Sequence, residues 1–89
     1  NLTRESVMIT IVFFAALREQ LGCAQLNLAI DTPSTVLEVK QYLINEHPHW
    51  QKILQHESIL SAVNHTVVGS EFVLKSGDEV AFFPPVTGG

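Results

Sequence analysis

The pattern of hydrophobic and polar positions predicts two strands, separated by a short helix, in the first third of the chain. Residues 8–14 are β-branched and aromatic, which favours a strand whose side chains alternate between two faces. With the odd-numbered positions toward the core, Phe14 points to the opposite face. Residues 15–21 hold good helix formers and stop at Gly22, which suits the position after a helix. Residues 25–30 alternate polar and apolar side chains, as a half-buried strand does.

The middle of the chain predicts the principal helix. Thr35 and Glu38 have the spacing of a capping box, in which each side chain bonds the backbone N–H of the other at a helix start. Apolar residues then recur at helical spacing over about three turns, and the helix is expected to end near His47 and Pro48. Residues 50–54 can form a further short turn. The apolar positions assigned to the principal helix are Val36, Leu37, Val39, Leu43 and Ile44.

More strands are predicted after the helix. Residues 59–63 form one, and a tight turn at 64–66 leads into the apolar pair 67–68. A second turn at 76–78 precedes the last strand, 79–83. A principal helix packed on one face of a mixed sheet defines an α+β fold.

Two phenylalanines are too apolar for ordinary exposed strand positions. In the last strand Val80 and Phe82 share one face, and Phe83 lies on the other. If the first and last strands are neighbours, Phe14, Phe83 and Val67 gather into an exposed apolar patch, and such patches mark partner surfaces. A place in the core for the two phenylalanines is the alternative, since a register slip of one residue exchanges the faces.

Size and composition narrow the class of protein. The 89 residues suit one domain with a small core, which favours a carrier, a subunit or a binding module over a complete enzyme with its own cleft. With 46% apolar and 16% charged residues, the chain is not of the disordered type. Its net charge of −4 and five Lys and Arg argue against nucleic-acid and anionic-membrane partners. A single cysteine allows no intrachain disulfide and favours a reducing, cytoplasmic setting.

The chain divides into three segments. Residues 1–7 precede the first methionine and are expected to be a tag remnant or an extension outside the fold. Residues 8–83 form the domain, and residues 84–89 form an extended tail. Pro84 and Pro85 carry the chain off the last strand. Gly88 and Gly89 leave the terminal carboxylate without side-chain bulk, so it can enter a narrow channel in another protein.

These features resemble the molybdopterin synthase small subunit family, the MoaD family of ubiquitin-like sulfur carriers. The tail motif, Phe-Phe-Pro-Pro-Val-Thr-Gly-Gly at 82–89, is the specific part of the resemblance, which extends over residues 8–89. The weaker supporting matches are Gly-Asp-Glu-Val at 77–80, Phe-Phe-Ala at 13–15 followed by Arg18 and Glu19, and Ala-Val-Asn at 62–64.

The resemblance implies a β-grasp (ubiquitin-like) fold and a covalent cycle at Gly89. An E1-like enzyme would adenylate the Gly89 carboxylate with ATP, so that AMP is linked there transiently, and a sulfur donor would then convert it to a thiocarboxylate. The large synthase subunit would take the sulfur for the molybdopterin dithiolene, in a heterotetramer. No cofactor would bind stably, and the chain would be no enzyme on its own. The implied inserting residues are Pro85, Val86, Thr87 and Gly88; the implied partner contacts are Phe14, Val67 and Phe83.

Two other functions stay open from the sequence. One is a different carrier with the same fold, such as the thiamine-pathway sulfur carrier, or a modifier that is conjugated to proteins. The other is a plain interaction domain whose Gly-Gly end is inert. A free thiocarboxylate at Gly89 indicates a carrier, and isopeptide bonds from Gly89 to lysines indicate a modifier. Unchanged complementation by a Gly89-blocked variant indicates an inert end.

The remaining reactive side chains favour ordinary roles. Cys23 follows a turn and suits a small apolar position better than a sulfur relay. Asp78, next to Glu79, fits a turn residue better than a general acid. Two of the four histidines flank a proline, with no thiol or carboxylate at ligand spacing nearby, so ordinary surface histidines are favoured over a metal site. The four are His47, His49, His56 and His65.

Overall fold

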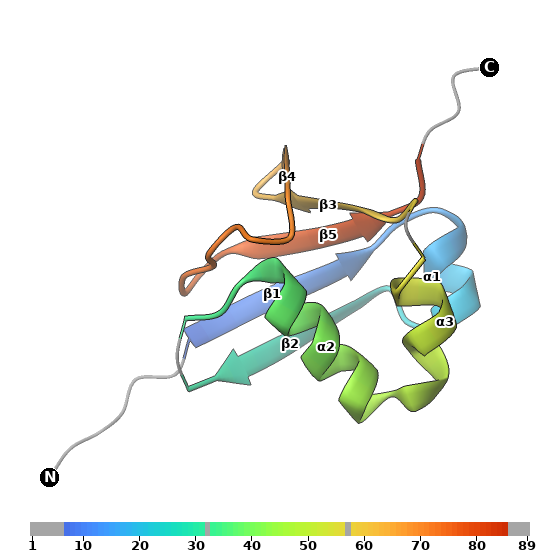
Figure 1. The fold of residues 1–89 in the computed structure, drawn as a ribbon, viewed down its shortest axis with the longest axis horizontal. Helices are drawn as coiled ribbons and strands as arrows, with labels where there is room; N and C mark the ends of the chain where they lie inside the picture. The colour runs from blue at the N-terminus through green and yellow to red at the C-terminus, as the bar shows by residue number, and fades with distance from the viewer. Residues whose placement is uncertain (1–6, 32, 57, 86–89) are drawn as a thin grey trace, which may run out of the picture.

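The fold is a five-stranded mixed sheet with its main helix on one face (Figure 1). A computed structural model describes residues 7–31, 33–56 and 58–85. The sheet has the order β2-β1-β5-β3-β4. The elements are β1 (Val7–Phe13), α1 (Ala16–Leu21), β2 (Gln25–Ile30), α2 (Val36–Glu46), the 3₁₀ turn η1 (Pro48–Trp50), α3 (Gln51–Leu54), β3 (Leu60–Val63), β4 (Thr66–Val68) and β5 (Glu79–Phe83).

The first and last strands lie side by side at the centre of the sheet. β1 and β5 are parallel, with Ile11 opposite Val80 and Phe13 opposite Phe82. β2 pairs with β1, and β3 with both β4 and β5, in antiparallel fashion. Parallel neighbours need a long crossover, which the rest of the chain supplies. The predicted α+β arrangement is confirmed, and the adjacency of the first and last strands, on which the predicted apolar patch depended, is present.

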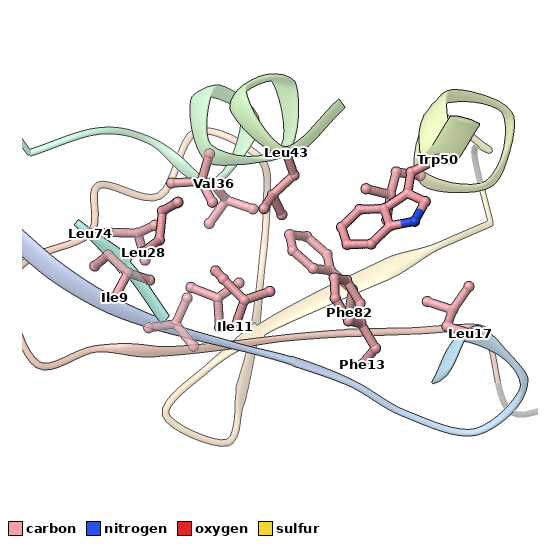
Figure 2. Packing of buried hydrophobic residues seen from close by; sticks show 14 of the residues in the cluster. Ile9, Ile11, Phe13, Leu17, Leu28, Val36, Leu43, Trp50, Leu74 and Phe82 are labelled. Atoms are coloured by element: carbon pink, nitrogen blue, oxygen red, sulfur yellow. The ribbon is translucent and has the colours of Figure 1, made fainter. Parts of the chain in front are cut away.

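The core lies between the sheet and α2, η1 and α3, as Figure 2 shows. The ring of Phe13 is stacked on that of Phe82, with centroids 6.0 Å apart, and meets Trp50 edge-on at 5.4 Å. Burial of each such large side chain stabilises the fold by about 1.5–3 kcal/mol. The predicted core face of the first strand is therefore confirmed.

The capping box at the start of α2 forms as predicted. Thr35 Oγ1 accepts a hydrogen bond from Glu38 N at 3.1 Å, and Glu38 Oε1 accepts one from Thr35 N at 2.8 Å. The assignment of Leu37 to the apolar face was wrong, because its side chain is exposed. Successive helical residues are turned by about 100°, so Leu37 leaves the stripe that its neighbour Val36 occupies.

The ends of the domain differ slightly from the expected boundaries. β1 begins at Val7, which is buried, so this residue belongs to the sheet and not to the leading segment. At the other end the chain leaves β5 after Phe83, and Pro84 and Pro85 continue outside the strand. Among residues 7–31, 33–56 and 58–85, no helix is long and apolar enough to cross a membrane.

Candidate docking surface at the root of the tail

One row of small and apolar side chains crosses the face of the sheet that is turned away from α2. The strand registers place Val12 opposite Ala81, Ala81 opposite Ala62, and Ala62 opposite Val67. Most of their strand neighbours belong to the core or pack against it, so these four share the opposite face. The two alanines are nearly covered, at 7% and 8% exposure, because larger side chains stand around them.

The alanines form the floor of an apolar hollow. Because a methyl group reaches only a short way above the sheet, the surrounding longer side chains leave a depression of about 340 Å³. Its lining exposes much more apolar than polar surface, as partner-binding surfaces do. The lining residues are Phe14, Ala15, Ala62, His65, Glu79, Ala81, Phe83 and Pro84.

Phe14 stands at the rim of this hollow and is fixed by its backbone. Its N–H donates to the carbonyl of Phe82 at 3.1 Å, and its own carbonyl accepts from Leu17 N at 3.2 Å. The first bond continues the β1–β5 pairing by one residue, and the second closes a turn into α1. The side chain is 47% exposed, so it is not a core residue.

The sequence-predicted contact residues are only partly brought together. Phe14 and Phe83 line the same hollow, and Phe83 is half-buried. Val67 is 63% exposed and on the same face, but it lies at the edge strand and outside the lining. The exposed patch is therefore centred on Phe14 and Phe83, and Val67 lies apart from them on the same face.

Sequence reasoning missed the floor and the polar rim of the hollow. Ala62 and Ala81 were assigned no site role; the one available signal was a small residue within each strand, because their pairing depends on the β3–β5 register. The polar rim comes from His65 and Glu79, whose Nε2 and Oε1 atoms are 3.8 Å apart. His65 was counted as an ordinary surface histidine. Its proximity to Glu79 depends on a strand register that the sequence alone did not fix.

The root of the C-terminal tail adjoins this hollow. β5 is held between β1 and β3, and Pro84, the first residue after it, lines the hollow. Pro85 is exposed. The other residues implied for insertion and modification, Val86, Thr87, Gly88 and Gly89, lie outside the described part of the chain.

The remaining reactive side chains lie elsewhere. Cys23 is half-buried near the start of β2, and its thiol lies 3.6 Å from the carbonyl of Gln25. His47 is stacked on Trp50 with ring centroids 3.9 Å apart, which is a packing role. Within residues 7–31, 33–56 and 58–85, no group of three or more His, Cys, Asp or Glu is placed to hold a metal ion.

The sheet order, the helix on one face and the strand that runs directly into a Pro-Pro segment define the chain as a ubiquitin-like β-grasp domain. It belongs to the ThiS family, whose pattern matches residues 11–89. This membership, together with the two curated relatives described next, confirms the resemblance drawn from the tail motif.

Two curated relatives match over their whole length. The molybdopterin synthase sulfur carrier subunit of Escherichia coli is 44% identical over 82 residues, which are 92% of this chain and 100% of the relative. The protein with the same name in Haemophilus influenzae is 39% identical over 82 residues, with the same two coverages.

Solved structures share the fold. The crystal structure of SAMP1 from Haloferax volcanii has a TM-score of 0.79 and 26% identity, covering 92% of this chain and 99% of that one. A Helicobacter pylori structure, a complex of subunits 1 and 2 of molybdopterin-converting factor, has a TM-score of 0.64 and 20% identity, covering 93% of this chain and 100% of that one. The second likeness shows the fold alone.

Proposed function

We propose that this chain is the sulfur carrier subunit of a molybdopterin synthase. The observation that carries the proposal is the 44% identity, along the full length of the relative, to a protein with that name. The Gly-Gly terminus and the apolar hollow beside the tail root support it. The fold supplies a compact body and a docking surface, and the chemistry takes place at the terminal carboxylate.

The proposed cycle activates that carboxylate and replaces one of its oxygens. A carboxylate is a poor acceptor of nucleophiles, so an E1-like enzyme joins Gly89 to the AMP part of ATP and releases pyrophosphate. A donor at the sulfide level, written as HS⁻, then attacks the acyl carbon through its sulfur; AMP leaves with one carboxylate oxygen, the sulfur's proton goes to solvent, and a thiocarboxylate remains. The thiocarboxylate sulfur is a soft nucleophile, as a thiolate is. In an extended path, residues 84–89 reach about 20 Å, which suits insertion into a partner's channel.

The large synthase subunit is the proposed partner for the hollow. A protein that accepts the tail must lie against the surface from which the tail departs, and Pro84 and Phe83 belong to that surface. The Helicobacter pylori structure with the same fold is a complex of subunit 1 with subunit 2 of molybdopterin-converting factor. We infer an analogous pairing here, within a heterotetramer, and a separate encounter with the E1-like enzyme that also reads the tail.

The test is to follow the mass of the protein through the cycle. The purified chain is mixed with its E1-like enzyme, ATP and a sulfur donor, and intact mass spectrometry measures the product. We expect the gain of one sulfur in place of one oxygen, with fragmentation placing the change at Gly89. A variant lacking Gly89 should keep its fold by circular dichroism and gain no sulfur, whereas Cys23→Ser should gain as much as the wild type. Sulfur uptake by the shortened variant would contradict the proposal.

A protein modifier is the second candidate, favoured by the TM-score of 0.79 to SAMP1, which is named a small archaeal modifier protein in another solved structure. A modifier would join Gly89 to lysine amino groups of other proteins. Mass spectrometry of the chain recovered from cells separates the two functions. A free thiocarboxylate supports the carrier, and isopeptide adducts support the modifier.

A further inference from the structure

Ala15 has a backbone conformation that glycine normally takes. Its φ is 57° and its ψ is −135°. It follows Phe14 in a tight turn, closed by the bond from Leu17 N to the Phe14 carbonyl at 3.2 Å. A positive φ at the first central position of such a turn strongly favours glycine, because a Cβ atom crowds the adjacent carbonyl. The alanine therefore strains the backbone at this position.

The fold gains no packing in return for this strain. Ala15 is exposed and belongs neither to the buried core nor to the partly buried residues packed against it. Elsewhere in the described chain a positive φ falls on residues that tolerate it. Gly22 and Gly77 are glycines, while Asn64 and His65 form the two-residue turn between β3 and β4. Ala15 is the exception, and glycine there would suit the isolated domain better.

The position of Ala15 offers a use for its side chain. It lines the apolar hollow together with Phe14, Phe83 and Pro84, at the point where β5 gives way to the tail. A partner that accepts the tail must therefore lie against the surface that contains Ala15.

We propose that the Ala15 methyl group is a contact of the docking surface, retained for partner binding despite its strain on the fold. This inference rests on the proposed function, and its occupant is the large synthase subunit. The turn itself does not require the methyl group, so its removal leaves Phe14 in place and takes away a single apolar contact.

Ala15→Gly tests the proposal because it should move stability and affinity in opposite directions. Relief of the strain should raise the melting temperature of the free domain by about 4 °C. Loss of one buried methyl should weaken binding to the large subunit about four-fold, measured by calorimetric titration. If Ala15→Gly acted only by changing the stability of the fold, the more stable variant would not bind the large subunit more weakly.

Ala16→Gly is the matched control. Ala16 is the neighbouring alanine, exposed in the first turn of α1 and outside the hollow lining. We expect a lower melting temperature, because glycine loses more freedom on folding, and an unchanged affinity. Equal affinity of Ala15→Gly and the wild type, or a lower melting temperature of Ala15→Gly, overturns this inference and leaves the proposed function unaffected. Absence of binding by the wild type overturns the proposed function and this inference with it.

Discussion

Asn64 donates a hydrogen bond from Nδ2 to Oδ1 of Asp78 across 2.9 Å, and this contact ties the β3–β4 turn to the residue before β5. Asn64 Oδ1 accepts from Glu79 N at 3.0 Å, and the second carboxylate oxygen of Asp78 accepts from Lys75 N at 2.9 Å. The Asp78 carbonyl also accepts from Thr10 N in β1. The Asn64–Asp78 pair thus reinforces the start of β5, whose register also rests on its backbone pairing with β1 and β3.

Asp78 should make the stability of the domain depend on pH in the acid range. Burial alone raises the pKa of its carboxyl group, but the hydrogen bonds from Lys75 N and Asn64 and the charge of Lys75 outweigh it, so the pKa lies below its ordinary 3.8. The folded state therefore favours the ionised form. The resulting stability is present above pH 3.8 and is lost as the pH falls through the lowered pKa of the folded state.

Asp78→Asn is expected to lower the free energy of unfolding at pH 7 by about 1–3 kcal/mol. The variant cannot accept both hydrogen bonds as a carboxylate does. The difference from the wild type should narrow as the pH falls below 3.8, measured by urea unfolding at several pH values. Glu71→Gln, at an exposed carboxyl group, serves as the control for a general effect of charge. A difference that stays constant down to pH 2 would contradict the role of the ionised carboxylate.

The sequence was sufficient for most of the fold because local signals and the hydrophobic pattern agreed. The Thr35–Glu38 capping box predicted the start of α2, and the apolar run 80–83 after a turn predicted β5. Leu37 shows that apolar character alone does not predict burial. Its place on the helix, one residue after Val36, turns its side chain away from the core. The alternation in residues 8–14 predicted that Phe14 faces away from the core, whereas no local pattern predicted the turn at Ala15 that follows it.

The site was predictable only in part, for a related reason. The composition of the tail predicts a reactive end, and the patterns of single strands predict Phe14 and Phe83 as contacts. The hollow between them depends on the alignment of Ala62 with Ala81, which are distant in the chain and meet only through the register of β3 and β5. The outlying position of Val67 likewise follows from the pairing of β4 at the sheet edge.

Trp50 should tolerate phenylalanine far better than alanine. Its indole is 3% exposed, contacts Phe13 edge-on and is stacked by His47, while its Nε1 has no hydrogen-bond partner among the described residues. Trp50→Ala should destabilise the domain by about 3–5 kcal/mol through the cavity it leaves. Trp50→Phe removes an unpaired buried donor together with some volume, so we expect a change within about 1 kcal/mol. Thermal and urea unfolding measure both, and equal losses would contradict this account.

Thr35→Ala should weaken the start of α2. The substitution removes the acceptor for Glu38 N, and such N-cap losses reduce stability by about 1 kcal/mol. Thr35→Ser retains a hydroxyl oxygen and is the matched control, expected to lie near the wild type in urea unfolding. If serine destabilises as much as alanine, the methyl group and not the hydrogen bond accounts for the effect.

Polar substitution of Phe14 should weaken association with the large subunit more than it weakens the fold. Because the ring stands half-exposed at the rim of the hollow, Phe14→Ser removes apolar contact area chiefly from the complex, and aromatic anchors of this kind dominate binding energy. We expect the dissociation constant to rise about tenfold or more, with a loss of stability under about 1 kcal/mol. The same substitution at Val67, outside the hollow, should have a smaller effect on binding.

Phe72→Ser is the matched control, since Phe72 is a phenylalanine of similar exposure, 40%, that does not line the hollow. Calorimetric titration with the large subunit should find it equal to the wild type. If Phe14→Ser instead unfolds the domain while its refolded fraction binds normally, Phe14 acts in the fold. If Phe72→Ser weakens binding as much as Phe14→Ser does, the docking surface lies elsewhere, because the two rings come from different loops and only Phe14 adjoins the root of the tail.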